Sequence, residues 1–547
     1  MNNEESLIQR TTVGLGINSQ KNTSSEKDLK PWILLVCGNF GFTSEHPQQV
    51  SSATIQDFIQ TCGAKVEGEV KDDLPESVEP FFVQTTIKAF SDFSEEQLLQ
   101  KTAVMKTFLD ARETLDMVSR QKITPTEGRS RIVSLELPAS IKGPIIGLLG
   151  AQPRQERQTP TAQNGSIADS IMSMMDTGEK SSTPLDNLIS AIGGAENVLS
   201  FSPSQLIKSQ QLIDNVITRV STAVRTSSHY LSIASSWYSL KNLLKKIGRN
   251  RNVSVYLNSS SSPEALGSFQ KASTFCFDNT LTPDLIIWSY DIPALSLSTI
   301  EELNTLAAFA DNLKSLILTS VAVNDPVLDI LSTATMNETF EQSETWNAFQ
   351  CLRSESHSRA LALCAPNFFI TTAKEKLIAR GAWLVADHWV STFLSVNTPF
   401  NFAALSTTEI HDDQLLVQVA PHKVKEISQY GLTFARTKTG RMILSPRVVF
   451  DSGENESFGY IGFNLLVNRA IRLAGEFLSF GTTKTTIEKA AETLNTYLLA
   501  QLDSYNILSS SDSLSVEPDS QNSITVAIHS DSIIDGNSVN FEFSFDY

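Results

Sequence analysis

The second half of the sequence repeats one pattern, in which a short apolar run is followed by a helical stretch. The runs are "NVSVYLN" (252–258), "PDLIIWSY" (283–290), "SLILTSVAV" (315–323) and "RALALCA" (359–365). Stretches with helical spacing separate them, such as "STIEELNTLAAFADNL" (298–313). Alternating strands and helices are typical of α/β proteins, in which helices cover a largely parallel sheet. The sequence therefore predicts an α/β fold.

Composition and charge narrow the class of protein. The 547 residues carry a formal net charge of −17, which argues against general binding to nucleic acid or to anionic membranes, since both need a positive surface. The five cysteines are scattered and never spaced as CxxC, a usage typical of reduced thiols. The start, "MNNEESLIQR", lacks the apolar region of a signal peptide, and no apolar run is long enough for a membrane span. We therefore expect a cytoplasmic protein that does not insert into membranes.

Composition shifts divide the chain into five expected parts. A polar arm covers residues 1–30, and a small α/β domain covers 31–120, beginning with the buried-type strand "PWILLVCGNFGF". The Pro-, Gln- and Thr-containing sequence near 151–166 is typical of a linker, which we place at 121–165. A helical region at 166–230 and a larger α/β domain at 231–547 complete the division.

Both ends of the sequence contain alternating apolar residues typical of strands. In "TTVGLGIN" the apolar positions are Val13, Leu15 and Ile17. The closing sequences "NSITVAIHSDSI" (522–533) and "NSVNFEFSFDY" (537–547) alternate over longer stretches. Such strands promote aggregation if they stay unpaired. They must be covered within the chain or added to a neighbour's sheet.

No motif in the sequence predicts catalysis, a cofactor or a metal site. "GTTKTT" (481–486) lacks the spacing of a phosphate-binding loop and is typical of a helix cap. "IHDDQ" (410–414) fits a surface turn, and His388 fits a structural role on a helix. "SESHSR" (354–359) places Ser, Glu and His next to one another, whereas a catalytic triad is assembled from separate elements. We expect a protein that is not an enzyme; a cytosolic α/β enzyme is a less favoured alternative.

A basic stretch at 235–258, "SSWYSLKNLLKKIGRNRNVSVYLN", needs an explanation in so acidic a chain. Its apolar residues Trp237, Leu240, Leu244 and Ile247 share one helical face, with lysines on the other. Gly248 is placed to end the helix, so the lysines lie where positive charge favours the carbonyl end. The pattern predicts a capped helix entering a strand, in preference to a nucleic-acid patch.

This stretch and two later ones resemble the large sheath subunit (TssC or VipB) of type VI secretion systems. Trp237 and Leu240 match the first motif, while Tyr238 and Ser239 depart from its Arg-Gly pair. "WNAFQCLRSESHSRALALCAPNFF" is similar to a second region, through Trp346, Arg359, Pro366 and Phe368, with Asn367 in place of an arginine. "APHKVKEISQYGLTFARTKTGRMILS" is similar to a third, and the late helices and closing strands fit the C-terminal part of that family.

The first hundred or so residues resemble instead the small sheath subunit (TssB or VipA). "LLVCGNFGF" is similar to its glycine-containing strand end, with Asn39 where aspartate is usual. The helix after "FSDFS" carries further matches, with Glu95 where proline is usual: Asp92, Phe93, Ser94, Leu109, Ala111, Arg112 and Leu115. The chain thus looks like both sheath subunits fused, a small α/β sheath domain followed by a larger one with a helical N-terminal part and terminal strands for exchange.

The resemblance implies a structural protomer of a contractile sheath. Such a protomer polymerises helically with copies of itself around an inner, Hcp-like tube, meets a baseplate, and contracts to propel the tube into a target cell. It implies no cofactor, and it adds a ClpV-like AAA+ unfoldase as a recycling partner. A sheath from a phage-like or extracellular injection device is the alternative within this class.

The same resemblance suggests roles for three groups of residues. Strands exchanged between protomers would use the alternating positions at both ends: Val13, Leu15, Ile17, Ile524, Val526, Ile528, Val539, Phe541, Phe543 and Phe545. The unfoldase would recognise a helix in "SIADSIMSMMDTG" through Ile167, Ile171 and Met174. Glu488 and Glu492, on a late acidic helix, are the candidates for contact with the inner tube.

Overall fold

The structure is a computed structural model, and it describes most of the chain outside the first 28 residues and a long central segment. The described residues are 12–13, 29–71, 80–94, 97–98, 103–149, 203–290, 292, 294–320, 343–372, 376–405, 409–451, 453, 456–481, 486–505, 507–508, 513–519 and 523–546. These residues separate into two compact units. Unit 1 contains residues 1–68, 84–94 and 228–547, and unit 2 contains residues 69–83 and 95–227.

Unit 1 is organised around a mixed sheet with parallel strands at its centre. In the described residues its order is β13-β12-β9-β8-β7-β2-β6-β3, and all neighbours are parallel except at the two edges, where β13 and β3 run antiparallel. The strands are β2 (Trp32–Gly38), β3 (Gln48–Val50), β6 (Val253–Ser259), β7 (Leu285–Trp288), β8 (Leu316–Ser320), β9 (Leu361–Ala365), β12 (Leu432–Lys438) and β13 (Arg441–Ser445). The α/β fold expected from the sequence is confirmed.

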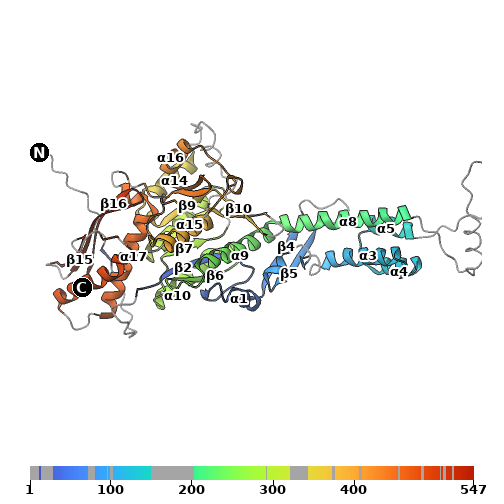
Figure 1. Ribbon diagram of the computed structural model, residues 1–547, viewed down its shortest axis with the longest axis horizontal. Helices are drawn as coiled ribbons and strands as arrows, with labels where there is room; N and C mark the ends of the chain where they lie inside the picture. The colour runs from blue at the N-terminus through green and yellow to red at the C-terminus, as the bar shows by residue number, and fades with distance from the viewer. Residues whose placement is uncertain are drawn as a thin grey trace, which may run out of the picture. The chain divides into compact units, whose positions relative to one another are not determined.

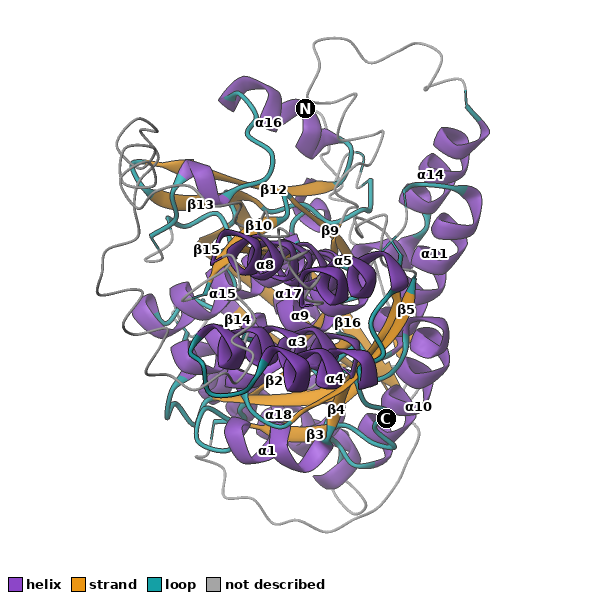
Figure 2. Cartoon of the chain, turned by 90° about the vertical axis from the view of Figure 1, so that its right-hand side faces the viewer, coloured by secondary structure: helices purple, strands orange, loops and turns teal. Residues whose placement is uncertain are grey.

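Helices cover both faces of this central sheet. One face packs against α10 (Ala265–Asp278), α11 (Leu297–Asn312), α14 (Glu344–Ser354) and α16 (Pro421–Gln429), which share one core with Leu35, Ile286 and Ile317. The first three follow one another along one side of the unit (Figure 2). Against the strands also lie α15 (Gly381–Val396) and α17 (Ile461–Gly481). Because both faces are covered, β7, β8 and β9 are apolar and buried at nearly every position.

The basic stretch forms the helix α9 (Ser228–Ile247), followed by β6, as its periodicity predicts. Trp237 is fully buried and donates a hydrogen bond from Nε1 to the carbonyl of Phe40, at 3.0 Å. Gly248 has a φ of 59°, the left-handed conformation expected of a residue that ends a helix. The lysines have partners inside unit 1: Lys241 lies 4.3 Å from the centre of the Phe90 ring, and Lys246 pairs with Asp387 of α15.

The expected small domain at 31–120 does not form a unit of its own. Its first strand, β2, lies between β6 and β7 in the middle of the central sheet, paired along its whole length with β6. The physical reason is that β2 is apolar on both faces and needs neighbours on both edges. The short elements α1 (Ile55–Cys62), β4 (Ala64–Val70), β5 (Phe81–Ile87) and the 3₁₀ turn at Phe90–Phe93 follow it. The unit boundary passes through β4 and β5.

Unit 2 is mainly helical. It contains α3 (Ala103–Ser119), α4 (Pro125–Ser134), α5 (Ala139–Leu149) and α8 (Pro203–Thr226), which lie together in Figure 1. They share a core that includes Phe108, Leu115, Ile132, Ile145 and Ile213. A smaller cluster joins Val70 and Val83 to Ala223 and Val224 of α8.

The prediction of a linker at 121–165 is wrong over its first part, because residues 125–134 form helix α4 and residues 139–149 form helix α5. Thr124 and Glu127 make a capping box: the Thr124 hydroxyl accepts from the Glu127 N–H, and the Glu127 carboxylate accepts from the Thr124 N–H. This Thr-x-x-Glu signal in "TPTE" marks a helix start that composition alone hides. Residues 150–202 lie outside the described part of the chain.

Smaller sheets and late elements complete unit 1. The hairpin of β10 (Phe368–Thr371) and β11 (Lys376–Ala379) stands apart from the central sheet. Helix α18 (Ile487–Asp503) precedes β14 (Leu514–Pro518), β15 (Ser523–Ile534) and β16 (Asn537–Asp546). Together with β1 (Thr12–Val13), these strands form a second sheet of the order β1-β16-β15-β14, which we call the terminal sheet. Short 3₁₀ turns lie at Ser262–Glu264, Ser356–Ala360, Asp412–Gln414 and Glu456–Gly459.

Candidate functional site

The terminal sheet brings the two ends of the described chain together. β15 and β16 form a long antiparallel hairpin, and β14 pairs antiparallel with β15 on its other side. β16 pairs in parallel with β1 through Thr12 opposite Ser544 and Val13 opposite Phe545. The sequence predicts a strand at each end of the chain but not that they pair with each other.

The apolar positions of β15 and β16 that were named for strand exchange share the covered face of this sheet. Ile524, Val526 and Ile528 of β15 lie opposite Phe545, Phe543 and Phe541 of β16. All six side chains are buried, as is Val539, and Phe541 meets the ring of Phe463 on α17 at 5.7 Å. The side chains are thus covered within the chain, while exchange through the backbone edge stays a prediction.

The two faces of the hairpin differ in polarity. Positions between the buried ones carry Thr525, His529, Asn540, Glu542 and Ser544, which are exposed or half-buried. This alternation places the apolar side chains on α17 and leaves a polar face outward. Outward polarity keeps the sheet face from being a hydrophobic patch.

The edges of the terminal sheet are only partly paired in the described residues. β1 covers β16 at two positions, so the stretch of β16 from Asn537 to Phe543 has no second partner strand there. β14 forms the opposite edge, and its last residue is Pro518, which suits an edge because proline has no N–H to donate. Leu15 and Ile17 lie outside the described residues. An unpaired strand edge is a template for a further strand.

A tight turn and a buried acid fix the β15–β16 hairpin to the rest of unit 1. Asp535 and Gly536 form the turn with φ of 50° and 92°, the Asp-Gly type that joins twisted antiparallel strands. Asp535 Oδ1 accepts from the Ala403 N–H at 2.8 Å, and Oδ2 accepts from the Gly462 N–H at 2.9 Å. Burial raises the pKa of this carboxyl to about 7, although the backbone N–H groups oppose the shift.

Sequence reasoning missed Asp535, and an available signal points to it. "IIDGNSV" places Asp-Gly between two alternating strands, which is the strongest short-range indication of a hairpin. The Asp535 side chain turns inward because residues 403 and 462 donate to it, and both lie more than seventy positions away in the sequence. The contact therefore becomes visible only in three dimensions.

The other predicted site residues are not brought together. Ile167, Ile171 and Met174 lie outside the described residues, so the unfoldase helix stays a prediction. Glu488 and Glu492 are exposed in the first turns of α18, a position open to a partner, and their contact with a tube also stays a prediction. The exchange positions are therefore the candidate group that the described structure gathers into one place.

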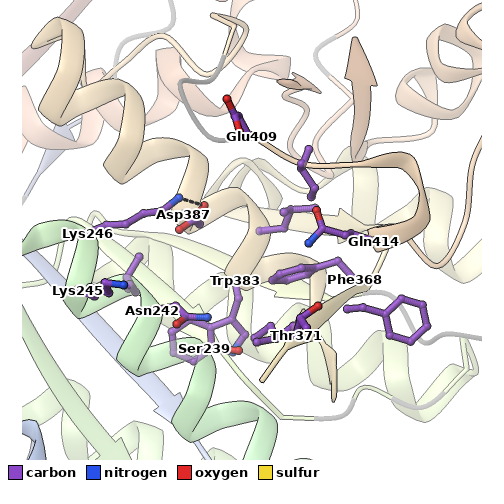
Figure 3. A pocket seen from close by; sticks show the side chains of 15 residues that line it. Ser239, Asn242, Lys245, Lys246, Phe368, Thr371, Trp383, Asp387, Glu409 and Gln414 are labelled. Carbon is purple, nitrogen blue, oxygen red and sulfur yellow. Dashed lines mark hydrogen bonds and ion pairs between the residues drawn. The ribbon is translucent and has the colours of Figure 1, made fainter. Parts of the chain in front are cut away.

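A cavity of about 480 Å³ lies beside α9, α15 and β10 (Figure 3). Its apolar wall contains Leu243, Phe368 and Trp383, and its rim carries Lys245 and the Lys246–Asp387 ion pair. The buried Ser239 hydroxyl has no hydrogen-bond partner in the described structure. Among the described residues that line the cavity there is neither a histidine nor a cysteine.

A histidine and three cysteines of unit 1 are buried, and burial shifts the pKa of each. His388 is fully buried, Nε2 lies 2.9 Å from the carbonyl oxygen of Phe402, and burial lowers its pKa to about 4. Cys37, Cys276 and Cys364 are buried free thiols whose pKa is raised by burial, which leaves them unreactive. Among the described residues, no cluster of His, Cys, Asp and Glu is suited to a metal ion, and no helix is both long and apolar enough to cross a bilayer.

Comparison with solved structures finds chains of a prophage baseplate and of sheath proteins. A chain of the anti-feeding prophage baseplate has 13% identity over 56% of this chain and 80% of its own length, with a TM-score of 0.38. A chain of the helical sheath of the same prophage, in its contracted state, has 13% identity. The match covers 56% of this chain and 77% of that chain, with a TM-score of 0.34. A sheath tail protein from Desulfitobacterium hafniense has 11% identity. The match covers 53% of this chain and 62% of that chain, with a TM-score of 0.33. TM-scores below 0.5 do not establish a common fold.

Comparisons at the level of sequence give no family. No protein-family model matches this chain, and no curated protein matches it.

Proposed function

We propose that this protein is a structural protomer of a contractile sheath, which polymerises with copies of itself through its terminal sheet. The observation that carries the proposal is the meeting of both chain ends in one sheet whose β16 edge is largely unpaired in the described residues. Motif matches to the small and large sheath subunits support the same assignment, through residues such as Arg112, Trp237 and Arg359.

The build of the terminal sheet suits strand addition. The buried apolar face holds β15 and β16 on α17, so a further strand can pair with the edge without disturbing the core. Backbone hydrogen bonds supply affinity in this mode of recognition, and alternate side chains supply specificity. The N-terminal arm, with Val13, Leu15 and Ile17, is the proposed donor to a neighbouring protomer.

Finer assignments belong to the same proposal. The chain combines both sheath subunits of a type VI-like system, encloses an Hcp-like tube, rests on a baseplate and is recycled by a ClpV-like unfoldase. The helix at 166–178 would be read by the unfoldase, and Glu488 and Glu492 would face the tube. An extracellular, phage-like injection device would use the same protomer without a recycling unfoldase.

Electron microscopy of the purified full chain tests the proposal. We expect hollow helical tubes, alone or with the tube protein present. A chain that stays monomeric at all concentrations, with and without the tube protein, would overturn the sheath assignment.

Removal of residues 2–18 tests the donor strand separately. This truncation leaves in place every side chain of unit 1 that the structure describes as buried, whereas deleting β16 would remove four buried apolar side chains. We expect a folded subunit that no longer assembles. The matched control removes only residues 2–10 and keeps "TTVGLGIN"; it should assemble like the full chain. Normal tubes from the longer truncation would rule out the arm as donor.

A further inference from the structure

The turn of the terminal hairpin is held by one side chain. We propose that Asp535 is a latch whose carboxylate fixes the β15–β16 hairpin to the start of α17, and thereby positions the β16 edge for assembly. The holding role stands on contacts within the chain, while the link to assembly rests on the proposed function. We use "latch" for Asp535 together with the backbone N–H groups of Ala403 and Gly462 that donate to it; the Phe402 backbone also acts on this carboxyl.

The latch joins segments that are far apart in sequence. Asp535 lies in the turn of the hairpin, Ala403 in the loop after α15, and Gly462 in the first turn of α17. Each carboxylate oxygen accepts from a different segment, at 2.8 and 2.9 Å, and the side chain is only 5% exposed. One residue therefore sets the distance between the hairpin turn, the loop and the helix.

Close packing on the helix side makes the contact specific. A Cβ on Gly462 would lie 1.8 Å from the Phe400 carbonyl oxygen and 2.6 Å from Asp535 Oδ2. Real Cβ atoms do not approach so closely, so only glycine lets α17 begin at this distance from the hairpin. The backbone of residue 535 has a positive φ, a conformation that aspartate and asparagine tolerate better than other side chains with a Cβ.

The charge on the latch has little nearby compensation from side chains. The cation that acts on Asp535 is Arg447, whose guanidinium lies over the Tyr460 ring at 3.8 Å. His388 of α15 hydrogen-bonds the Phe402 carbonyl and is neutral near pH 7, and Asp531 of the hairpin is exposed. The positive end of α17 and the backbone donors therefore supply most of the stabilisation of the anion.

This imbalance gives the latch a measurable pH dependence. Burial raises the pKa of Asp535 to about 7, from 3.8 in an exposed aspartate, so docking of the hairpin takes up a proton between these values. The docked hairpin is therefore favoured most at low pH, and it loses this advantage as the pH rises to about 7. Above that value the contribution is constant.

Hydrogen exchange of the full chain from pH 5 to pH 8 tests the latch. In the wild type, after correction for intrinsic rates, protection of the β15, β16, Ala403 and Gly462 amides should fall as the pH rises to 7 and then level off. In D535N this fall should be lost, because asparagine does not titrate, and the remaining slope should be that of His388, which has the opposite sign.

D531N is the matched control, since it removes a charge from an exposed site of the same hairpin. It should keep both the slope and the protection of the wild type. The same pH dependence of protection in D535N as in the wild type would overturn the latch. If D535N does not fold, the wild-type slope alone decides.

Electron microscopy of the same variants separates the latch from the proposed function. If the wild type forms tubes and D535N does not, the latch positions the assembly edge. If D535N forms normal tubes despite a loosened hairpin, the link to assembly is wrong. If the wild type forms no tubes, the sheath proposal fails while the exchange data still judge the latch.

Discussion

The central sheet hides both of its faces, whereas the terminal sheet hides only one. Every residue of β8 and β9 is buried, because helices pack on both sides of them. In β16, buried Val539, Phe541, Phe543 and Phe545 alternate with residues that are exposed or half-buried. The central sheet is therefore an interior scaffold, whereas the terminal sheet keeps a polar face and, as far as the described residues go, a largely unpaired β16 edge.

Different interactions hold the two sheets. At the amino ends of β2 and β7, buried Asp284 receives Arg469 and Arg472 of α17, and Asp284 also accepts from the Ile33 N–H. The terminal sheet is held by aromatic packing on α17 and by the Asp535 latch. α17 thus contacts both sheets, one through charge and the other through apolar side chains. Substitutions in the central sheet should therefore affect folding, whereas substitutions at the edge of the terminal sheet should affect assembly.

The largest effect is expected from Asp284→Ala in the central sheet. It would leave two nearly fully buried arginines without their carboxylate, a loss of about 3–5 kcal/mol in the free energy of unfolding. Urea unfolding measures it. Glu67→Ala, which removes an exposed ion pair with Lys65, is the control and should cost less than about 1 kcal/mol. Equal effects of the two would contradict the role of the buried cluster.

Phe541→Ala should cost about 3 kcal/mol, because it opens a cavity against Phe463 on the covered face of the terminal sheet. The neighbouring Asn540→Ala, on the outward face, should change stability by less than about 0.5 kcal/mol. Urea unfolding of the two variants compares the faces directly. Similar costs would remove the distinction between a covered and an open face.

Acid should weaken the helix layer over the central sheet through His388. Its pKa is lowered to about 4, so between pH 6.5 and 4 the unfolded chain binds a proton that the folded chain does not. This contribution to the free energy of unfolding is lost as the pH is lowered, by about 2 kcal/mol from pH 7 to pH 5. Asp535 acts in the opposite direction over this range, so the difference between H388Q and the wild type is the quantity to measure.

Glutamine keeps a donor for the Phe402 carbonyl and does not titrate, so H388Q should show a shallower loss of stability in acid. The exposed His529 of the terminal sheet supplies the control, H529Q, which should retain the wild-type loss. Chemical unfolding at pH 5, 6 and 7 gives the three slopes. A slope in H388Q as steep as that of the wild type would exclude His388 as its source.

The smallest effect is expected at the rim of the cavity on α9. Lys246→Met breaks the half-exposed ion pair with Asp387 and should cost about 0.5 kcal/mol. Lys245→Met changes the next residue, which is also exposed but for which the structure gives no ion pair, and should be close to neutral. Urea unfolding at low and high salt separates them, because salt screens the pair. A loss above 2 kcal/mol would mean that the pair belongs to the core.

Local patterns in the sequence predicted local structure well. The alternation from Asn252 onward gave the strands β6 to β9, and the periodicity around Trp237 gave α9 with its glycine end. The closing alternation gave β15 and β16 with the correct faces. In each case the side chains that decide the structure lie within one turn or a few residues of one another.

Long-range placement could not be predicted in the same way. Nothing near Trp32 indicates that β2 enters the sheet between β6 and β7, which follow it by more than two hundred residues. A composition shift suggested a linker at residues that fold as α4 and α5, since the capping box of Thr124 and Glu127 is a weaker signal than proline and glutamine content. The Asp535 latch depends on backbone donors in two distant segments.

The position of β2 has a consequence for synthesis of the chain on the ribosome. Its partners β6 and β7 begin at Val253 and Leu285, so more than two hundred further residues must be synthesised before β2 can pair. Unit 2 lies in the intervening sequence and is complete by residue 227. Unit 2 can therefore fold before β2 finds its partners, while this apolar strand remains exposed and open to chaperones. If the chain were expressed as two polypeptides divided within 150–202, the first would hold β2 and β3 and the second the other six strands of the central sheet, so the two would have to be made together.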